Sequence, residues 1–557
     1  MLHLRPMSGS ASPSRAARRQ QWLEQVDAAL RQQGMAAAAR LAVQALADGV
    51  EHPSVLNLAA WIHYEEGRLE EAVALLKRAR ALAPRDAHVL NSLGVCLRAL
   101  GRIDAARDAY EAAIRADGRL AAAHFNRGAV LEELNDMKGA RAAYEKAAGL
   151  DRGYVDPVAG LAWLSAQNGD AAEARTLGER ALRMAPGNLL ARMALASAGL
   201  QARDFGAASG LLDELQGDPR LSPTNRSIVL GLVGDLRDAT GEPAQAFEAY
   251  RASNEEMRRL HAPVYEAPGR ESALAAATRL RAWFQAADPA AWRSAPEARP
   301  RASDPKLHVF LMGFPRSGTT LLENVLAAHP DVVSLEERDC LAPAIQSYLG
   351  SAGGVARLAS LPSGEAARQR EAYWTAVRSF GVEPRGKVFI DKMPLASLNL
   401  PLIAKLFPGA RILFARRDPR DVVLSCFRRR FGMNPSMYRL LTLEGAAAFY
   451  DAVMALAEVY RELLPLPQHL VRYESLVEDF EGTARAACEF LGLAWDEGLR
   501  DFAERARRRG ISTPSAAQVA RGLNREGQGS WRRYRKQLAP VLPVLQPWVD
   551  RFGYQRD

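Results

Sequence analysis

The sequence of 557 residues contains few cysteines and no long apolar segment. Its four cysteines lie far apart, without a Cys-x-x-Cys pair and without a neighbouring histidine cluster. This scarcity excludes a disulfide-dense secreted scaffold and disfavours a zinc site. No run of about 18 consecutive apolar residues occurs, so we expect no transmembrane helix. Residues 1–21 lack the apolar core of a signal peptide, and we therefore expect a cytoplasmic protein with reduced thiols.

Acidic residues are in modest deficit, and the deficit is local. The chain has 73 Lys and Arg against 64 Asp and Glu, a formal charge of +9. Residues 405–439 carry a net charge of +7 and residues 500–537 a net charge of +8, which leaves −6 for the remaining residues. An evenly basic surface would favour nucleic acid or membrane, whereas two local concentrations favour a polyanionic ligand. We expect neither a nucleic-acid partner nor a membrane partner.

The first half of the sequence repeats with a period of 34 residues. One position of each copy is alanine: Ala38, Ala72, Ala106, Ala140, Ala174 and Ala208. Small residues allow two antiparallel helices to approach closely. Another position of the repeat, occupied by Gly67, Gly101 and Gly169, is expected to turn the chain between the two helices. The pattern resembles the tetratricopeptide repeat over residues 19–262. Bacterial origin is consistent with the abundance of alanine and arginine.

A tetratricopeptide array is expected to form a superhelix whose concave face binds an extended peptide or a partner helix. We therefore predict a protein or peptide partner for residues 19–262. A structural arm or a dimerisation surface is the alternative, and the oligomeric state is left open. Residues 1–18 are predicted to be a disordered lead-in, and residues 263–305 a helix followed by a linker rich in proline, alanine and arginine. A second domain is predicted for residues 306–557.

The second domain begins with a pattern typical of phosphate binding. Residues 308–312 are an apolar run that predicts a buried strand, residues 313–320 (GFPRSGTT) a glycine-containing loop, and residues 321–328 a helix. Such a loop directs backbone N–H groups and the positive end of a helix dipole toward an anion. The loop ends in Gly-Thr-Thr rather than the Gly-Lys-Ser/Thr of a Walker A motif, which disfavours a nucleotide kinase. Its cation is Arg316 instead.

The segment PRSGTT resembles the first nucleotide-binding loop of the sulfotransferases that use 3′-phosphoadenosine 5′-phosphosulfate (PAPS). Later segments resemble further motifs of that family in the same order, at residues 411–425, 471–474 and 515–531. The resemblance implies a P-loop-like α/β domain with a parallel sheet, PAPS as the sulfuryl donor, and no metal. The residues that it implies for cofactor binding are Arg316, Ser317, Gly318, Thr319, Thr320, Arg417, Ser425, Arg429, Tyr473, Arg521 and Asn524.

The sequence is most similar to the tyrosylprotein sulfotransferases and their bacterial relatives with tetratricopeptide repeats. This resemblance implies that Glu337 is the catalytic base, with Glu336 as the alternative, and gives catalytic roles also to Lys392, Arg316 and Ser515. In such a reaction a base removes the proton of the acceptor hydroxyl, and cations stabilise the charge that develops on the leaving oxygen.

One departure from the family and two alternative functions remain. Ser530 precedes Trp531, where the tyrosylprotein family typically has a lysine.

The acceptor is a protein tyrosine in one interpretation and a glycan, a lipid or a small molecule in others. A protein of a different class is also consistent with the repeats, namely a scaffold in which the α/β half is a catalytically weak nucleotide-binding module. The presence of Glu337, Lys392 and Arg417 argues against this scaffold.

Overall fold

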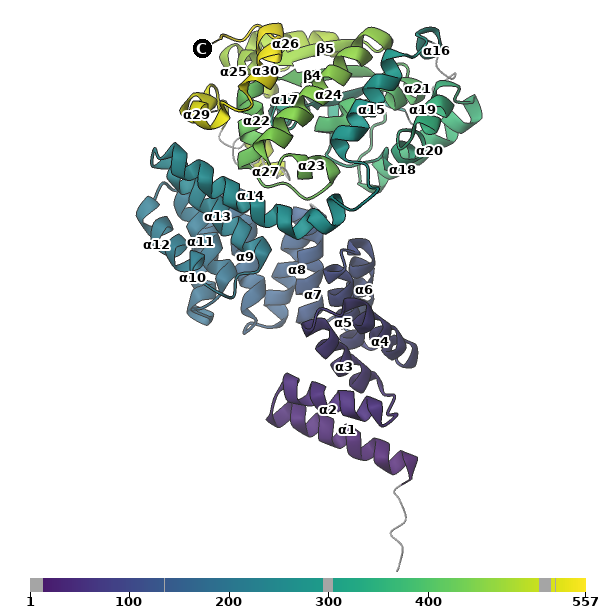
Figure 1. The fold of residues 1–557 in the computed structure, drawn as a ribbon, viewed down its shortest axis with the longest axis vertical. Coiled ribbons are helices and arrows are strands. Elements are labelled where there is room, and N and C mark those ends of the chain that lie inside the picture. Colours follow the sequence, from purple (N-terminus) through teal and green to yellow (C-terminus); the bar gives the residue numbers. More distant parts are fainter. Residues whose placement is uncertain (1–13, 135, 294–303, 510–521, 526, 557) are drawn as a thin grey trace, which may run out of the picture. The chain divides into compact units, whose positions relative to one another are not determined.

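The computed structural model describes residues 14–134, 136–293, 304–509, 522–525 and 527–556 (Figure 1). The chain divides into two compact units, the first comprising Met1–Leu164 and Ala174–Ala191 and the second Ser165–Glu173 and Arg192–Asp557. The second unit therefore combines the last helices of the repeat region with the C-terminal domain. Across these ranges, no helix has both the length and the apolar character needed to cross a membrane.

The N-terminal half consists of antiparallel helical hairpins, which confirms the predicted repeat array. Its helices are α1 (Arg15–Gln32), α2 (Met35–Ala47), α3 (Pro53–Glu65), α4 (Leu69–Leu82), α5 (Ala87–Ala99), α6 (Ile103–Ala116), α7 (Ala121–Glu133), α8 (Met137–Leu150), α9 (Val155–Gln167), α10 (Ala171–Met184), α11 (Leu189–Gln201), α12 (Phe205–Gln216), α13 (Pro223–Ala239) and α14 (Pro243–Tyr265). The alanines in the 34-residue series are all 0% exposed, so a larger side chain there would separate the packed helices.

Aromatic rings fill the space that small residues leave within a hairpin. A Cβ placed on Gly94 would lie 2.5 Å from Cε1 of Tyr110, and one on Gly128 would lie 2.6 Å from Cδ1 of Tyr144. The hairpin of α13 and α14 repeats this arrangement, because a Cβ on Gly234 would lie 2.5 Å from Cε1 of Tyr250. Shared packing identifies α13 and α14 as a hairpin of the same type.

The turn positions of the repeats also follow the sequence pattern. Gly67, Gly101 and Gly169 have φ values of 74°, 70° and 85°, in the left-handed region that glycine tolerates. The next copy places Arg203 at this position, and it too has a positive φ, of 59°. The turn geometry is therefore imposed by the hairpin and persists where the favoured residue is absent.

A parallel five-stranded sheet forms the centre of the C-terminal domain. Its strands are β1 (Leu307–Gly313), β2 (Val332–Glu336), β3 (Val388–Lys392), β4 (Arg411–Arg416) and β5 (Gln468–Arg472), in the order β2-β3-β1-β4-β5. Every neighbouring pair is parallel. The loops that follow β1 and β4 therefore leave the same edge of the sheet from adjacent strands, which is where ligands bind in open α/β sheets.

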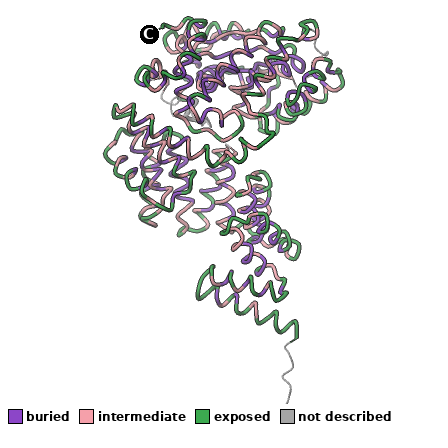
Figure 2. Tube along the Cα trace, viewed as in Figure 1, coloured by how far each residue is buried: buried purple, intermediate pink, exposed green. Residues whose placement is uncertain are grey.

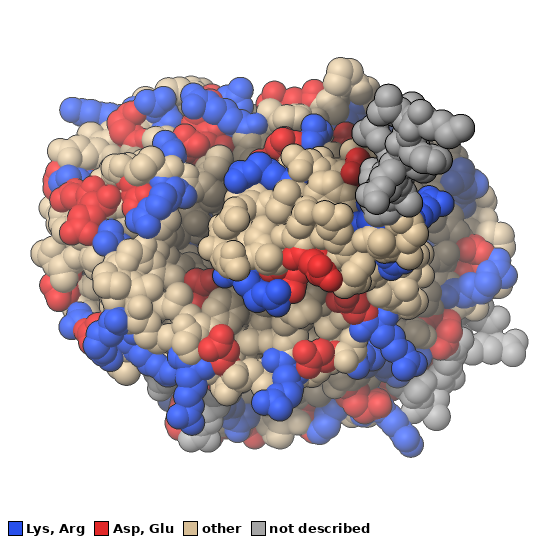
Figure 3. All heavy atoms as spheres, turned by 90° about the horizontal axis from the view of Figure 1, so that it is seen from below, with Lys and Arg blue, Asp and Glu red and all other residues tan. Residues whose placement is uncertain are grey.

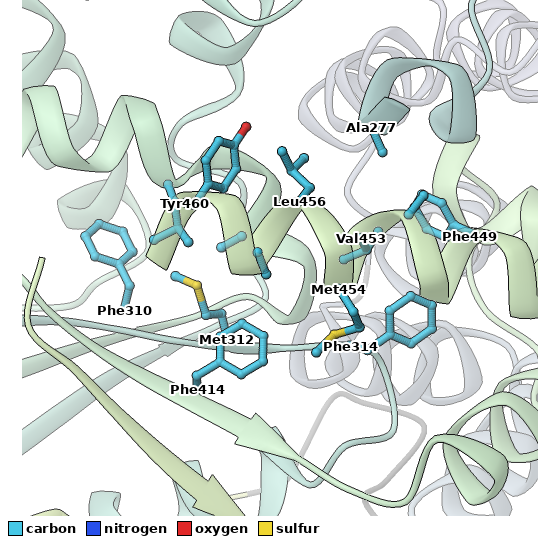
Figure 4. Close-up of a cluster of buried hydrophobic side chains, with 14 of the residues drawn as sticks. Ala277, Phe310, Met312, Phe314, Phe414, Phe449, Val453, Met454, Leu456 and Tyr460 are labelled. Atoms are coloured by element: carbon cyan, nitrogen blue, oxygen red, sulfur yellow. The ribbon is translucent and has the colours of Figure 1, made fainter. Parts of the chain in front are cut away.

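Both faces of the sheet are buried (Figure 2). Phe310 and Met312 of β1 point to one face, where with Phe414 they meet Val453 and Leu456 of α24 (Leu443–Leu463) in a large apolar cluster (Figure 4). The alternate residues of β1 and β3, including Val309 and Ile390, belong to a second cluster with α17 (Thr319–Ala327) and α26 (Phe480–Leu491). Burial on both faces is expected of parallel sheets covered by helices.

The remaining helices surround this sheet and complete the predicted α/β domain. They are α15 (Ala273–Gln285), α16 (Ala290–Arg293), α18 (Ala342–Tyr348), α19 (Ala352–Ala359), α20 (Ser363–Ser379), η1 (Pro394–Asn399), α21 (Leu400–Leu406), α22 (Pro419–Arg428), α23 (Pro435–Arg439), α25 (Tyr473–Glu478), η2 (Glu497–Asp501), α27 (Phe502–Arg509), η3 (Ser530–Tyr534), α29 (Arg535–Leu538) and α30 (Leu542–Arg551). The fold class expected from the sequence, a helical repeat array followed by a parallel α/β domain, is confirmed.

Candidate active site

The loop after β1 turns over the start of α17. Gly318 is the N-cap of α17 and has a φ of 95°. A Cβ at this position would lie 2.7 Å from Cδ2 of Tyr473, so a larger residue would collide with the ring. The first N–H groups of a helix have no intrahelical acceptor, and the helix dipole makes their surroundings positive. The loop and the first turn of α17 are therefore suited to bind an anionic oxygen.

Two arginines from different elements converge beside this loop. Arg316 Nε donates to Ser425 Oγ of α22 at 3.0 Å, and Arg417 Nη1 donates to the Arg316 carbonyl at 3.2 Å. The Arg417 guanidinium lies over the ring of Tyr473, 4.7 Å from its centroid. Within the described structure, the buried Nε of Arg417 has no hydrogen-bond partner. A phosphate in this place would satisfy that donor, because guanidinium groups bind phosphate with two parallel hydrogen bonds.

The surroundings of Arg316 are strongly positive. Burial, together with the neighbouring charges of Arg429 and Arg417, lowers the pKa of Arg316 to about 9. An anion bound beside these groups would favour their charged forms and relieve the repulsion between them. The residues present therefore fit a ligand that carries several negative charges.

Glu337 follows the last residue of β2 and faces Lys392 at the end of β3. The Glu337 N–H donates to the Lys392 carbonyl at 2.8 Å, and Lys392 Nζ donates to Glu337 Oε1 at 2.7 Å. The side chain of Lys392 is 0% exposed, whereas that of Glu337 is 27% exposed and lines the cavity described below. The carboxylate is therefore the member of this pair that a bound substrate can reach.

Two further carboxylates surround the ammonium group of Lys392. Glu323 Oε2 lies 3.5 Å and Glu336 Oε1 lies 3.6 Å from Nζ. Burial lowers the pKa of Lys392, but the charges of Glu337, Glu323 and Glu336 outweigh it and raise that pKa above its ordinary value. Lys392 is therefore protonated at neutral pH. Glu323 was not predicted from the sequence; Ser334 holds it by donating to its Oε1 at 2.8 Å.

The backbone is strained at Arg316 and at Glu337. Among the described residues, the non-glycine residues with positive φ are Arg203, Arg316 at 70° and Glu337 at 45°. A side chain in this region costs about 1 kcal/mol or more, and such strain is commonly found at functional sites. The surrounding structure therefore holds Arg316 and Glu337 in conformations that direct their side chains.

One cavity of about 690 Å³ joins the loop to the carboxylate. Its volume lies within the range of about 300–1,000 Å³ that is usual for ligand pockets. One set of lining residues, which we call the cationic wall, consists of the loop, the first turn of α17, Arg417 and Tyr473. A second set, which we call the apolar wall, has amide and hydroxyl groups at Asn399, Asn434 and Ser436 but is mostly apolar, and its apolar members include Ile345, Leu395, Leu398, Phe431 and Met437. The cavity lining thus combines polar and cationic groups with many apolar ones.

The structure brings most of the predicted cofactor residues together. Those that line the cavity are Arg316, Gly318, Thr319, Thr320, Arg417, Tyr473 and Asn524. Ser317 is buried in the loop behind this wall, and Ser425 contacts the cavity through Arg316. Arg429 does not belong to the described cavity lining; its Nη1 lies 3.9 Å from Oδ2 of Asp235 on α13, and its charge also acts on Arg316. Ser515 and Arg521 lie outside the described residues.

Asp421 connects the predicted second and last motifs, and it was not identified from the sequence. It lies in the first turn of α22, is 1% exposed, and accepts hydrogen bonds from the N–H groups of Gly529 at 2.7 Å and Trp531 at 2.9 Å. Its Oδ1 also accepts from Ser530 Oγ at 2.9 Å. The serine that replaces the expected lysine therefore helps to attach the late segment to α22.

Within the basic stretch 405–439, one arginine is buried and paired with an aspartate of the same stretch. Arg420 is 3% exposed, donates to Asp418 Oδ2 at 2.7 Å, and lies 3.9 Å from the ring of Trp531. On the face drawn in Figure 3, basic and acidic side chains are interspersed. No group of three or more potential metal ligands occurs among the residues that the structure describes.

Residues 308–497 match the family model described as "Sulfotransferase family", and residues 53–119, 92–155 and 160–225 match tetratricopeptide-repeat models. The chain combines a sulfotransferase-family domain with tetratricopeptide repeats. The family match extends from β1 to η2 and includes Arg316, Glu337, Lys392, Arg417 and Tyr473. The sulfotransferase domain therefore contains the whole arginine and carboxylate arrangement described above.

Similar curated proteins include an uncharacterized protein from Aquifex aeolicus, 28% identical over 44% of this chain and 33% of that protein. Protein-tyrosine sulfotransferase 1 from Danio rerio is 28% identical over 44% of this chain and 72% of its own length. Protein-tyrosine sulfotransferase from Drosophila melanogaster is 29% identical over 42% of this chain and 51% of its own length. The chain thus spans a third of the Aquifex protein and about half of the Drosophila protein.

Proposed function

We propose that this protein transfers the sulfuryl group of PAPS to an acceptor hydroxyl, and that the acceptor is a tyrosine side chain of a polypeptide. The observation that carries the proposal is that the exposed carboxylate of Glu337, paired with buried Lys392, opens into the same cavity as the anion-binding loop 315–320. A sulfotransferase requires a base and an anion site within one cavity, because the acceptor must approach the bound donor directly.

The cationic wall fits the phosphate and sulfate groups of the donor. The loop N–H groups and the start of α17 would hold the end of the nucleotide that carries the sulfuryl group, while Arg417 and Ser425 would hold its 3′-phosphate. Tyr473 offers an aromatic surface beside them. When bound, PAPS supplies the activated sulfuryl group.

The carboxylate pair supplies the proton chemistry in this proposal. Lys392 donates to Oε1 of Glu337, so the second carboxylate oxygen is available to accept the proton of the acceptor hydroxyl. Lys392 and Arg316 provide fixed positive charge in a buried environment, where it stabilises developing negative charge more strongly than it would in water. Ser515 is proposed to assist them, and Glu336 is the less accessible alternative base, with a side chain 14% exposed.

The apolar wall supports an aromatic acceptor. Phe431, Met437 and Leu398 offer contacts that suit the ring of a phenol better than the polyhydroxylated surface of a sugar. The curated relatives named above as protein-tyrosine sulfotransferases favour the same acceptor. Tetratricopeptide repeats generally mediate protein–protein contacts, and we propose that this array recruits the polypeptide that carries the tyrosine, or a partner of it.

Two measurements on the purified full-length protein test the proposal. Isothermal titration calorimetry with adenosine 3′,5′-bisphosphate is expected to show one binding site, and absence of binding would contradict the proposed donor site. Incubation with ³⁵S-labelled PAPS and a tyrosyl peptide is expected to label the peptide, whereas the matched phenylalanyl peptide stays unlabelled. Labelling of glycans, lipids or small phenols in place of the peptide would retain the enzyme class and reject the acceptor.

A further inference from the structure

The end of helix α22 is capped by the repeat hairpin α13–α14. Asn254 Nδ2 of α14 donates to the carbonyl of Phe427 at 2.8 Å, and both groups are buried. This carbonyl is one of the last four of α22. Such carbonyls accept no hydrogen bond from an N–H group of the same helix. Phe247 of α14 also stacks on Phe427, with ring centroids 5.0 Å apart. The hairpin therefore stabilises the helix that carries Ser425.

Asp238 of α13 makes a second connection at the same end of α22. Its carboxylate pairs with Arg428, the last residue of the helix, and accepts a hydrogen bond from Tyr534 Oη at 2.7 Å. Arg533 Nη1 lies 2.9 Å from Oδ1 of the same carboxylate. Asp238 thus joins three elements: the repeat hairpin, α22 and the late helix η3.

The charge balance of this junction depends on Asp238. Burial opposes ionisation of this carboxylate, but Arg428, the hydroxyl of Tyr534 and Arg533 outweigh it and lower the pKa of Asp238. The side chains of Arg428 and Asp238 are only 17% and 12% exposed. Removal of one partner from such a pair leaves the other charge buried without compensation, which is costly.

Helix α22 is therefore held at both ends. At its start, Asp421 accepts hydrogen bonds from residues 529–531, and at its end Arg428 reaches η3 through Asp238. Between these points lies Ser425, whose hydroxyl accepts the hydrogen bond of Arg316. A shift of α22 would move Ser425 and Arg316 together, and both belong to the proposed phosphate site.

We infer that Asp238, a residue of the repeat array, is a positioning residue for the donor site of the sulfotransferase domain. It acts through Arg428 and Tyr534, which fix the end of α22 against η3. The inference rests on the proposed function, because it concerns the same donor site. By linkage, donor binding must stabilise the hairpin as much as the hairpin favours donor binding.

The test compares Asp238→Asn with Glu248→Gln in the full chain. Glu248 is a carboxylate on the same hairpin that also pairs with an arginine, Arg251, but its side chain is 60% exposed. Calorimetry with adenosine 3′,5′-bisphosphate is expected to show a Kd raised roughly tenfold in Asp238→Asn and unchanged in Glu248→Gln. In turnover assays, the KM for the donor should rise with little change in kcat or in the KM for the acceptor.

Two further variants cover a failure of Asp238→Asn to fold. Tyr534→Phe removes one hydrogen bond to Asp238 and should weaken nucleotide binding less, while Asp238→Glu should partly restore it. Hydrogen exchange gives a second readout, in which adenosine 3′,5′-bisphosphate slows exchange in α13 and α14 but not in α1 and α2. Unchanged affinity in a folded Asp238→Asn or Tyr534→Phe protein would overturn the inference. Absence of binding by the wild-type chain would instead overturn the proposed function, and the inference with it.

Discussion

Lys392 Nζ lies 2.7 Å from Glu337 Oε1, and the ammonium is fully buried while the carboxylate reaches the cavity. The pair joins the ends of two neighbouring parallel strands, because Glu337 also donates its N–H to the Lys392 carbonyl. Glu323 and Glu336 surround the same ammonium. One buried cation thus organises three carboxylates, of which Glu337 is the most exposed and lines the cavity.

Substitution of this carboxylate is expected to affect turnover and leave nucleotide binding intact. Glu337→Gln keeps the size of the side chain but removes its ability to accept a proton, so kcat should fall by roughly 10²–10⁴. The Kd for adenosine 3′,5′-bisphosphate should stay near the wild-type value. The ³⁵S-transfer assay and calorimetry measure the two quantities.

The same assay on Glu336→Gln distinguishes the two adjacent glutamates. Glu336 is turned toward Lys392 and does not belong to the described cavity lining, so its loss should reduce kcat much less than that of Glu337. The assignment of the base would be reversed by a large loss in Glu336→Gln together with full activity in Glu337→Gln.

Gly318→Ala is expected to block the anion site sterically. The new Cβ would lie 2.7 Å from Tyr473, and the backbone there has a φ of 95°. Gly381 provides a matched control, since its φ is 74° and a Cβ there would meet no atom within 4 Å. Both alanine variants should lose about 1 kcal/mol of stability from backbone strain. Only Gly318→Ala should also lose nucleotide binding, as measured by calorimetry; equal binding by the two variants would exclude a role for the Tyr473 contact.

Arg417→Ala should weaken nucleotide binding by roughly 10- to 100-fold, because hydrogen bonds to charged groups contribute about 1.5–3 kcal/mol. Arg417→Lys should be only a partial replacement, since lysine lacks the planar pair of donors that matches phosphate. Arg500→Ala removes an exposed arginine that pairs with Glu497 and should bind the nucleotide normally. If calorimetry gave Arg417→Ala the affinity of the wild type, this residue would not belong to the phosphate site.

Local patterns predicted the fold well wherever they recur or carry a distinctive composition. Buried alanine at a 34-residue spacing indicated the hairpins, and the segment around Gly318 indicated the strand, loop and helix that β1 and α17 form. The short strand β2 was not predicted, because its five residues, which end in the first glutamate of a Glu-Glu pair, carry little periodicity. Residues 471–474, which resemble one family motif, are divided between β5 and helix α25, which begins at Tyr473. The end of a short strand is set by its pairing with the neighbouring strand, and a local sequence pattern does not contain that information.

The residues that sequence reasoning missed act through distant partners. Asp421 and Asp238 are ordinary aspartates in their own helices, and they acquire significance only through contacts with residues about 110 and 190 positions away. Glu323 lies on the buried side of α17, where a charged side chain is unusual. Its burial is explained by the ion pair with Lys392, which the sequence does not reveal. Motif similarity found residues that line the cavity and gave no information about those that hold them in place.

Asp391, adjacent to Lys392 on β3, should give the fold a distinctive pH dependence. Burial raises the pKa of Asp391 to about 7, although the hydroxyl of Tyr373, which donates to Oδ2 at 2.6 Å, opposes the shift. His308 Nε2 lies 3.0 Å from the same hydroxyl, and burial lowers the pKa of His308 to about 3, so it stays neutral above pH 4. When Asp391 is ionised, Tyr373 donates to it, and the neutral histidine is then the donor to Tyr373.

The folded chain therefore binds a proton at Asp391 more tightly than the unfolded chain does. Its contribution to stability is fully present below the ordinary pKa of aspartate and is lost as the pH rises through about 7. Asp391→Asn should remove this loss, so the difference in Tm between variant and wild type should grow in favour of the variant from pH 4 to pH 8. Tyr373→Phe removes a hydrogen bond that favours ionisation and should move the transition to higher pH. Thermal unfolding in a pH series measures both, and a Tm difference independent of pH would show that folding does not raise the pKa of Asp391.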